Sequence, residues 1–280
     1  MVMIAVITGV FGLILGSFVS ALTYRLHEQA ELEGKKGKAA AKRRKELSMV
    51  TGRSMCPHCS RELAAKDLVP VLSWLWLRGK CRYCGKPIPD SPLTEVMLGV
   101  AFAVSYLSWP HEMHGVGLFR FMCWLVFLVA FMALAVYDLR WYLLPDKIVF
   151  PLTGLVIVQV AVVAIWAHSF SALLQPAAGA AVIFGVFWGL FQVSGGNWIG
   201  GGDVKLAIAL GLLAGSPFRA LTVIFLASLV GTFASIPQLL KGKEGLNRRI
   251  PFGPALLLAT FVVVVYGDRL ATWYLGLTIR

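Results

Sequence analysis

The strongest constraint on this sequence is its long runs of apolar residues. Several reach about 20 residues, the length that an α-helix needs to cross the hydrocarbon core of a bilayer. Hydrophobic residues make up 58% of the 280-residue chain and charged residues only 14%, which excludes an ordinary soluble globule and a disordered protein. Because a helix satisfies its own backbone hydrogen bonds inside lipid, the sequence predicts an all-α polytopic membrane protein.

Eight apolar blocks are interpreted as transmembrane helices. They cover residues 1–22, 92–109, 117–137, 148–167, 173–193, 204–215, 218–240 and 254–266. The sixth block has only 12 residues, so a re-entrant helix is the alternative for it. The predicted organisation is a first transmembrane helix in residues 1–24, a polar loop domain in 25–91 and a transmembrane domain in 92–280.

The net charge of +12 is a topology signal rather than a sign of nucleic-acid binding, because the basic residues lie between the apolar blocks. If all eight blocks cross, 22 of the 26 lysines and arginines lie on one side, together with residues 25–91. Basic loops favour the cytoplasm. We therefore expect a cytoplasmic (inner) membrane protein with the loop domain in the cytoplasm. A re-entrant sixth helix would weaken this asymmetry.

Residues 28–47 form a charged run that contains alanines and few large apolar residues. Such a run is typical of a solvated helix or a flexible linker. The alternative is a contact between its basic residues and the lipid headgroups of the inner leaflet.

Four of the five cysteines lie in two Cys-x-x-Cys motifs of the polar loop. The motifs are Cys56-Pro57-His58-Cys59 and Cys81-Arg82-Tyr83-Cys84, separated by 21 residues, a spacing close to that of a four-cysteine zinc ribbon. Four thiolates fill a tetrahedral site and leave no open position, so the predicted zinc is structural. Two disulfides or a redox site are the alternative, which a cytoplasmic loop disfavours.

Two acids are placed at the same predicted membrane border. Asp203 follows three glycines at the start of the sixth span, and Asp138 ends the third. Charged residues beside apolar helices usually line a site or a water-filled cavity. Two close carboxylates cannot both ionise cheaply, so one holds a proton while the other deprotonates a water molecule, as in aspartic proteases. Asp138 and Asp203 are therefore the candidate catalytic pair.

Each acid also has a purely structural interpretation. Asp203 could be the N-cap of the sixth helix, and Asp138 could form a surface salt bridge with Arg140 or Lys147. Asp146 follows Leu144-Pro145 and is expected to cap the fourth span, with a reserve role as the second acid.

The residues beside Asp203 are candidates for substrate contact. Lys205 could bias the protonation of the pair or meet a substrate carbonyl, or it could extend to the lipid headgroups. Gly200 and Gly202 permit positive φ and a close backbone approach, as an extended substrate strand beside the acids would require. The run does not match a phosphate-binding loop, which needs a Gly-Lys-Ser/Thr end.

Together these motifs resemble the type IV prepilin peptidases, a family of bacterial membrane aspartyl proteases. The resemblance covers nearly the whole chain. Its motifs are Gly16-Ser17-Phe18, Tyr24-Arg25-Leu26, Arg53 to Cys59, Val69 to Trp74, Arg78 to Cys81, Pro92 to Glu95, Asp138 with Leu144-Pro145-Asp146, Gly200 to Lys205 as GxGDxK, and Ile250 to Pro254.

The resemblance implies that the protein removes the short basic leader of type IV prepilin or pseudopilin precursors by cutting after a glycine at the cytoplasmic membrane border. It also implies that Asp138 and Asp203 are the catalytic residues. Members with the cysteine domain also N-methylate the new N-terminus with S-adenosylmethionine. This sequence departs from the family pattern at Ser20, where Asn is usual, at His27, where Pro is usual, and in the charged insertion. These departures lie in the half of the chain associated with methylation.

Two other classes of function are weighed against this one. A proton-coupled transporter would use the same carboxylates as a relay, but it favours acids near the bilayer midplane rather than at helix ends. A membrane-tethered zinc ribbon that binds nucleic acid would leave both acids unexplained. We expect pilin-like precursors and the lipid bilayer as partners, and no nucleic acid.

Overall fold

The computed structural model describes the chain except residues 36, 49–51, 57, 89–91, 241–249 and 279–280. The basic loop at 241–249, which contributes to the predicted topology, therefore lies outside the described residues, as do Lys36 of the charged run and Pro57 of the first cysteine motif. The described part is helical, and its only β structure is two isolated bridges. The all-α prediction is confirmed.

Helices occur at all eight predicted spans. Six are long and apolar enough to cross a membrane: α1 (Val2–Glu31), α5 (Gly115–Trp141), α6 (Asp146–Trp166), α7 (Ser171–Ser194), α9 (Pro217–Leu239) and α11 (Gly253–Thr278). The other two, α4 (Leu93–Ser108) and α8 (Gly201–Ala214), are shorter. Several helices extend past the predicted ends, because hydropathy marks the apolar block while polar residues continue the helix beyond it.

Residues Met1–Leu107 form a first compact unit. Its helices α1 and α4 pack through glycines, since a Cβ on Gly12 would lie 2.7 Å from the carbonyl oxygen of Leu98, and one on Gly16 would lie 2.5 Å from Cα of Glu95. Small residues permit such backbone contacts between membrane helices.

The charged run of this unit is helical. It continues α1 to Glu31 and then forms the short helix α2 (Lys38–Glu46), which has no buried residue. The buried Arg25 ties the segment after α2 to α1, because its guanidinium donates to the carbonyl oxygens of Ser48 and Gly52 at 3.2 and 2.9 Å. The run is therefore mostly helical and exposed, and whether its basic residues meet solvent or lipid headgroups stays a prediction.

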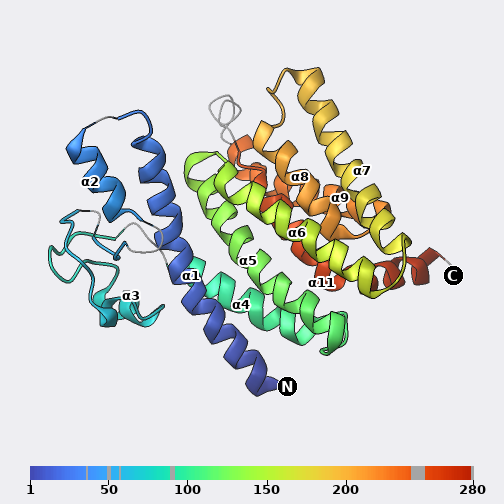
Figure 1. Ribbon diagram of the computed structural model, residues 1–280, viewed down its shortest axis with the longest axis horizontal. Helices are drawn as coiled ribbons and strands as arrows, with labels where there is room; N and C mark the ends of the chain where they lie inside the picture. Colours follow the sequence, from blue (N-terminus) through green and yellow to red (C-terminus); the bar gives the residue numbers. More distant parts are fainter. Residues whose placement is uncertain (36, 49–51, 57, 89–91, 241–249, 279–280) are drawn as a thin grey trace. The chain divides into compact units, whose positions relative to one another are not determined.

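Residues Ser108–Arg280 form a second compact unit. In it α8 packs against α6, α7, α9 and α11 (Figure 1). Half of its 14 residues are buried. The backbones of α7 and α8 nearly touch, since a Cβ on Gly211 would lie 2.4 Å from Cα of Ala180. A short helix suits this central position because other helices, rather than lipid, cover it.

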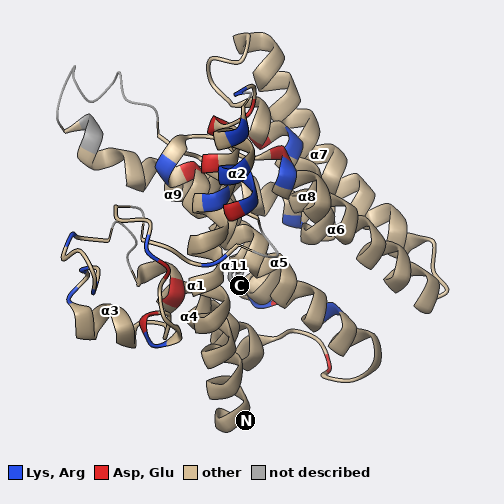
Figure 2. Ribbon diagram, turned by 60° about the vertical axis from the view of Figure 1, so that its left-hand side comes forward, with Lys and Arg blue, Asp and Glu red and all other residues tan. Residues whose placement is uncertain are grey.

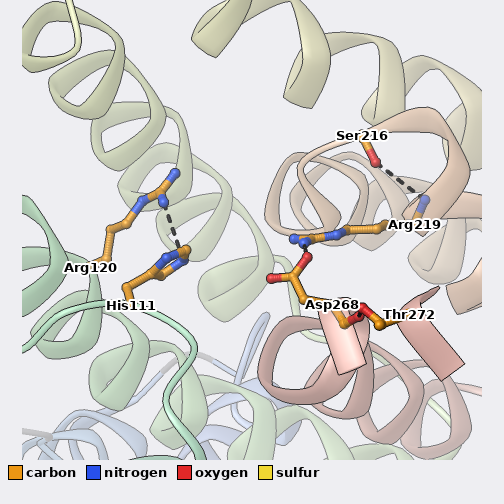
Figure 3. Close-up of polar contacts among 6 residues, drawn as sticks. All are labelled: His111, Arg120, Ser216, Arg219, Asp268 and Thr272. Carbon is orange, nitrogen blue, oxygen red and sulfur yellow. Dashed lines mark hydrogen bonds and ion pairs between the residues drawn. The ribbon is translucent and has the colours of Figure 1, made fainter. Parts of the chain in front are cut away.

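An ionic cluster closes one end of this second unit. The Arg120 guanidinium donates to Nε2 of His111 at 3.2 Å, and Arg219 is paired with Asp268 of α11 (Figure 3). The charge of Arg219 also acts on Arg120, so the beginnings of α5 and α9 lie near each other.

The position of this cluster shows that α8 extends from one end of the second unit to the other. Asp138 lies 18 residues after Arg120 on α5, roughly 27 Å at 1.5 Å per residue. The start of α8 lies beside Asp138, because the charge of Asp138 acts on Asp203. The end of α8 leads through Gly215 and Ser216 into α9, which carries Arg219. Thus α8 connects the same two ends as α5, which favours a crossing helix over a re-entrant one.

Candidate active site

Asp138 lies in the last turn of α5 and not in the loop that follows it. Only 6% of the residue is exposed, and its Oδ2 accepts a hydrogen bond from the backbone N–H of Gly253 at 3.0 Å. A buried carboxylate held in this way is not the surface salt bridge that the sequence left open. Gly253 is the first residue of α11, and a Cβ there would lie 2.6 Å from the same oxygen. The contact therefore requires glycine.

Asp203 is the third residue of α8. The helix begins three residues before the predicted start at residue 204, with Gly200 as its N-cap and no side-chain capping bond, so the N-cap interpretation of Asp203 is wrong. The first turn remains a favourable place for a carboxylate because of the helix dipole. Its Oδ1 is buried and has no hydrogen-bond partner among the described residues. That oxygen is free to accept a proton or a water molecule.

The structure brings the two acids together. The charge of Asp138, and not that of Asp146, acts on Asp203. Leu144 packs between the segments that carry them, since it would contact a Cβ on Gly202 at 3.0 Å and one on Gly253 at 3.5 Å. Two neighbouring carboxylates at one end of a helix bundle can share a proton and polarise a water molecule.

Lys205 and Asp146 form an ion pair beside this site. Nζ of Lys205 lies 2.8 Å from both carboxylate oxygens of Asp146 and 5.5 Å from the centre of the Phe150 ring. Asp146 is the first residue of α6, whose N-cap is Pro145. The predicted capping role of Asp146 is therefore wrong, because its carboxylate faces a lysine of the neighbouring helix α8.

The three glycines before Asp203 differ from expectation in their backbone. None of them has positive φ, because Gly201 and Gly202 already belong to α8. The expected close approach occurs at Gly202, where Leu144 leaves little room for a side chain. A role of Gly200 and Gly202 in substrate contact stays a prediction.

Gly253 and Leu144 were not singled out by the sequence. Both belong to motifs that carry the family resemblance, Ile250 to Pro254 and Leu144-Pro145-Asp146. That membership was the only available signal, since neither residue type is itself reactive.

The four motif cysteines form a second candidate site in the first unit. Their sulfur atoms all lie within 4.8 Å of one another, so the group could hold a metal ion. Each motif lies in a small hairpin, and the two hairpins have the same pattern of backbone hydrogen bonds. In the first, Cys56 N–H donates to Arg61 O and Ser60 N–H donates to Cys56 O. In the second, Cys81 N–H donates to Lys86 O and Gly85 N–H donates to Cys81 O. His58 is not part of the group. Its Nε2 donates to the carbonyl oxygen of Pro87 at 3.1 Å.

The distances and charges of this group fit zinc. Sulfurs at tetrahedral corners 2.3 Å from zinc lie roughly 3.8 Å apart, and Sγ of Cys56 and Cys84 are 3.8 Å apart. Desolvation opposes ionisation of Cys81, but hydrogen bonds from the N–H groups of Cys84 and Tyr83 and from neighbouring thiols outweigh it. They lower the pKa of Cys81 from 9.0 to about 7, which favours the thiolate that a metal needs. The backbone hydrogen bond from Lys86 lowers the pKa of Cys84, but desolvation and the neighbouring cysteines outweigh it and raise this pKa to about 11, so Cys81 ionises before Cys84.

Two family models match the chain. Residues 10–109 match the Bacterial Peptidase A24 N-terminal domain, and residues 125–236 match the Type IV leader peptidase family. The first match ends two residues after Leu107, the last residue of the first compact unit, and the second match contains Asp138 and Asp203.

Curated relatives match over nearly their whole lengths. A prepilin leader peptidase/N-methyltransferase of Aeromonas hydrophila is 32% identical over 95% of this chain and 91% of its own. A type 4 prepilin-like proteins leader peptide-processing enzyme of Escherichia coli O78:H11 is 32% identical over 92% and 93%. A prepilin leader peptidase/N-methyltransferase of Pseudomonas aeruginosa is 30% identical over 96% and 92%. No solved structure matches the chain significantly.

Proposed function

The chain belongs to the type IV leader peptidase family, and from this membership we propose that Asp138 and Asp203 are the catalytic aspartates of a prepilin leader peptidase. The observation that carries the assignment is that Leu144 packs against both Gly202, next to Asp203, and Gly253, which holds Asp138, so that two acids 65 residues apart in sequence lie near enough for the charge of one to act on the other. The protein is a multi-pass inner-membrane aspartic peptidase. The transporter alternative has no support among the relatives, whose names describe peptidases.

The proposed reaction is hydrolysis of one peptide bond by an activated water molecule. The pair shares one proton. The ionised carboxylate takes a proton from water, whose oxygen attacks the scissile carbonyl, while the protonated carboxyl donates to the carbonyl oxygen. Collapse of the tetrahedral intermediate breaks the C–N bond and passes a proton to the leaving amine. The two carboxylates end the cycle ready to share a proton again.

The chain supports this chemistry mainly by positioning. The N–H of Gly253 fixes one oxygen of Asp138, and Leu144 fixes the spacing between the starts of α8 and α11. The ion pair between Lys205 and Asp146 links α6 to α8 beside the site. Gly200 and Gly202 would lie along the peptide that reaches the acids.

The proposed substrates are type IV prepilin or pseudopilin precursors, whose basic leader is removed at the cytoplasmic membrane border. The distribution of basic residues supports this orientation, and it would place the cysteine loop on the same side as the acids. We assign the four cysteines to a structural zinc ion that would fix the fold of residues 25–91. The metal would leave no coordination position for a substrate.

A second activity, N-methylation of the new N-terminus with S-adenosylmethionine, follows from the names of the relatives. The first unit, which matches the N-terminal family model, is the proposed place for it.

The function is tested with the full-length protein in proteoliposomes and the prepilins that the Aeromonas hydrophila relative processes, with that enzyme as positive control. Mass spectrometry of the precursor should find the leader removed and, where methylation occurs, one methyl group on the new N-terminus. An intact precursor that the control enzyme cleaves would refute the peptidase function. Cleavage without the methyl group would refute only the second activity.

A further inference from the structure

The helix α3 (Leu72–Leu77) of the first unit has no buried residue although all its residues except Ser73 are apolar. Leu72, Leu75 and Trp76 are exposed by 66%, 58% and 83%. Their spacing of three and four residues places them on one helix face. The exposed Leu68 and Val69 precede them in the chain. We call Leu68, Val69, Leu72, Leu75 and Trp76 the α3 patch. An exposed apolar cluster of this kind marks an interaction surface.

Trp74 shows that this exposure is selective. Its indole ring folds back on the turn after the helix, where a Cβ on Gly79 would lie 3.1 Å from Cζ2 of the ring. One tryptophan of α3 therefore packs against the segment that leads to Cys81, and Trp76 points away from it.

A hydrogen bond fixes the depth of α3 relative to a membrane helix. The N–H of Val71, the residue before α3, donates to Oε2 of Glu95 at 2.6 Å. Glu95 is the third residue of α4, so α3 begins within about one helical turn, roughly 5 Å, of the level where this span starts. Val71 holds a positive φ of 60°, which is costly for a β-branched residue.

The surroundings of the α3 patch match the border of a bilayer. Val96 and Met97 are exposed on the first turns of α4, so an apolar surface exists at the same depth. The helix α3 carries no charge and is tan in Figure 2. Lys66 before it and Arg78 and Lys80 after it are exposed. Tryptophan together with flanking basic residues is typical of the headgroup level of membranes.

We propose that α3 is an interfacial helix, with the α3 patch inserted at the boundary between headgroups and acyl chains. Lys66, Arg78 and Lys80 reach the lipid phosphates from its two ends. Because Cys81 follows the helix by four residues, this contact holds the cysteine site against the membrane surface. The inference does not depend on the peptidase function.

The test uses tryptophan quenching in the full-length protein, reconstituted in nanodiscs with lipids brominated near the headgroups or deep in the acyl chains. The signal of Trp76 is the difference between the wild type and Trp76→Phe. Trp188→Phe gives a reference within an apolar membrane helix, because Trp188 is 50% exposed and lies six residues before the end of α7. Metal content and melting temperature verify that each variant is folded.

We expect shallow bromine to quench Trp76 more strongly than deep bromine does, and aqueous iodide to quench it weakly. Replacing Leu72 and Leu75 together by Asn should make Trp76 accessible to iodide and reduce its quenching by lipid. Quenching of wild-type Trp76 by iodide alone would show that α3 is in water. Quenching by neither agent would show that protein covers the patch. Either result overturns the proposal.

Discussion

Gly253→Ala tests whether the hydrogen bond at the start of α11 positions Asp138. The new Cβ would lie 2.6 Å from Oδ2 of Asp138, whereas ordinary contacts begin at 3.4 Å. The two groups must therefore separate by roughly 0.8 Å, which stretches the 3.0 Å hydrogen bond beyond the roughly 3.5 Å at which such bonds are lost.

The size of the expected effect follows from that bond. A hydrogen bond to a charged group contributes about 1.5–3 kcal/mol, and each 1.36 kcal/mol corresponds to about a tenfold change in rate. If half or more of this energy holds Asp138 in its reactive position, single-turnover cleavage of a prepilin should slow by about 4- to 160-fold.

The matched control is Gly267→Ala in the same helix. Its nearest contact would be 3.6 Å, so it should cleave at the wild-type rate. Both variants are compared by melting temperature, so that a loss of fold is separated from a loss of positioning. A folded Gly253→Ala variant that cleaves as fast as Gly267→Ala would refute the positioning role.

Three further predictions concern the pair beside the site, the helix contact and the metal. Lys205→Gln and Asp146→Asn should each lower the free energy of unfolding by less than about 1 kcal/mol, since the two side chains are 45% and 50% exposed. Thermal melts of the double variant should show little additional loss. Gly211→Ala should destabilise the protein by about 1–3 kcal/mol, because the new Cβ would overlap the backbone of α7. The control Gly189→Ala has open space around its Cβ and should melt like the wild type. Cys59→Ser should remove the bound zinc, measured as metal per chain by elemental mass spectrometry; undiminished zinc in this variant would contradict a four-thiolate site.

The acid pair could be predicted because it depends on topology. Hydropathy and basic residues place Asp138 and Asp203 at the same end of their helices, without any knowledge of packing. The partners of these acids could not be predicted in the same way. Gly253 lies 115 residues from Asp138, and the choice of that contact depends on how α11 approaches α5.

The exact ends of the helices could not be predicted from the sequence either. Glycines usually mark a break, so Asp203 was expected to start its helix, but packing against Leu144 favours a helical backbone through Gly201 and Gly202. Asp146 was expected to cap its own helix. It instead pairs with Lys205, 59 residues away, because tertiary contacts between neighbouring helices outweigh a local capping preference.

The central claim is that Asp138 and Asp203, and not Asp146, perform the hydrolysis. The most direct test is the single-turnover rate of prepilin cleavage for Asp138→Asn, Asp203→Asn and Asp146→Asn, each of which keeps the size of the side chain. The first two should lose at least about 100-fold, the lower range for a general acid–base group, while Asp146→Asn keeps most of the rate. Cleavage at the wild-type rate by Asp138→Asn or Asp203→Asn, or an equal loss in Asp146→Asn, would contradict the assignment.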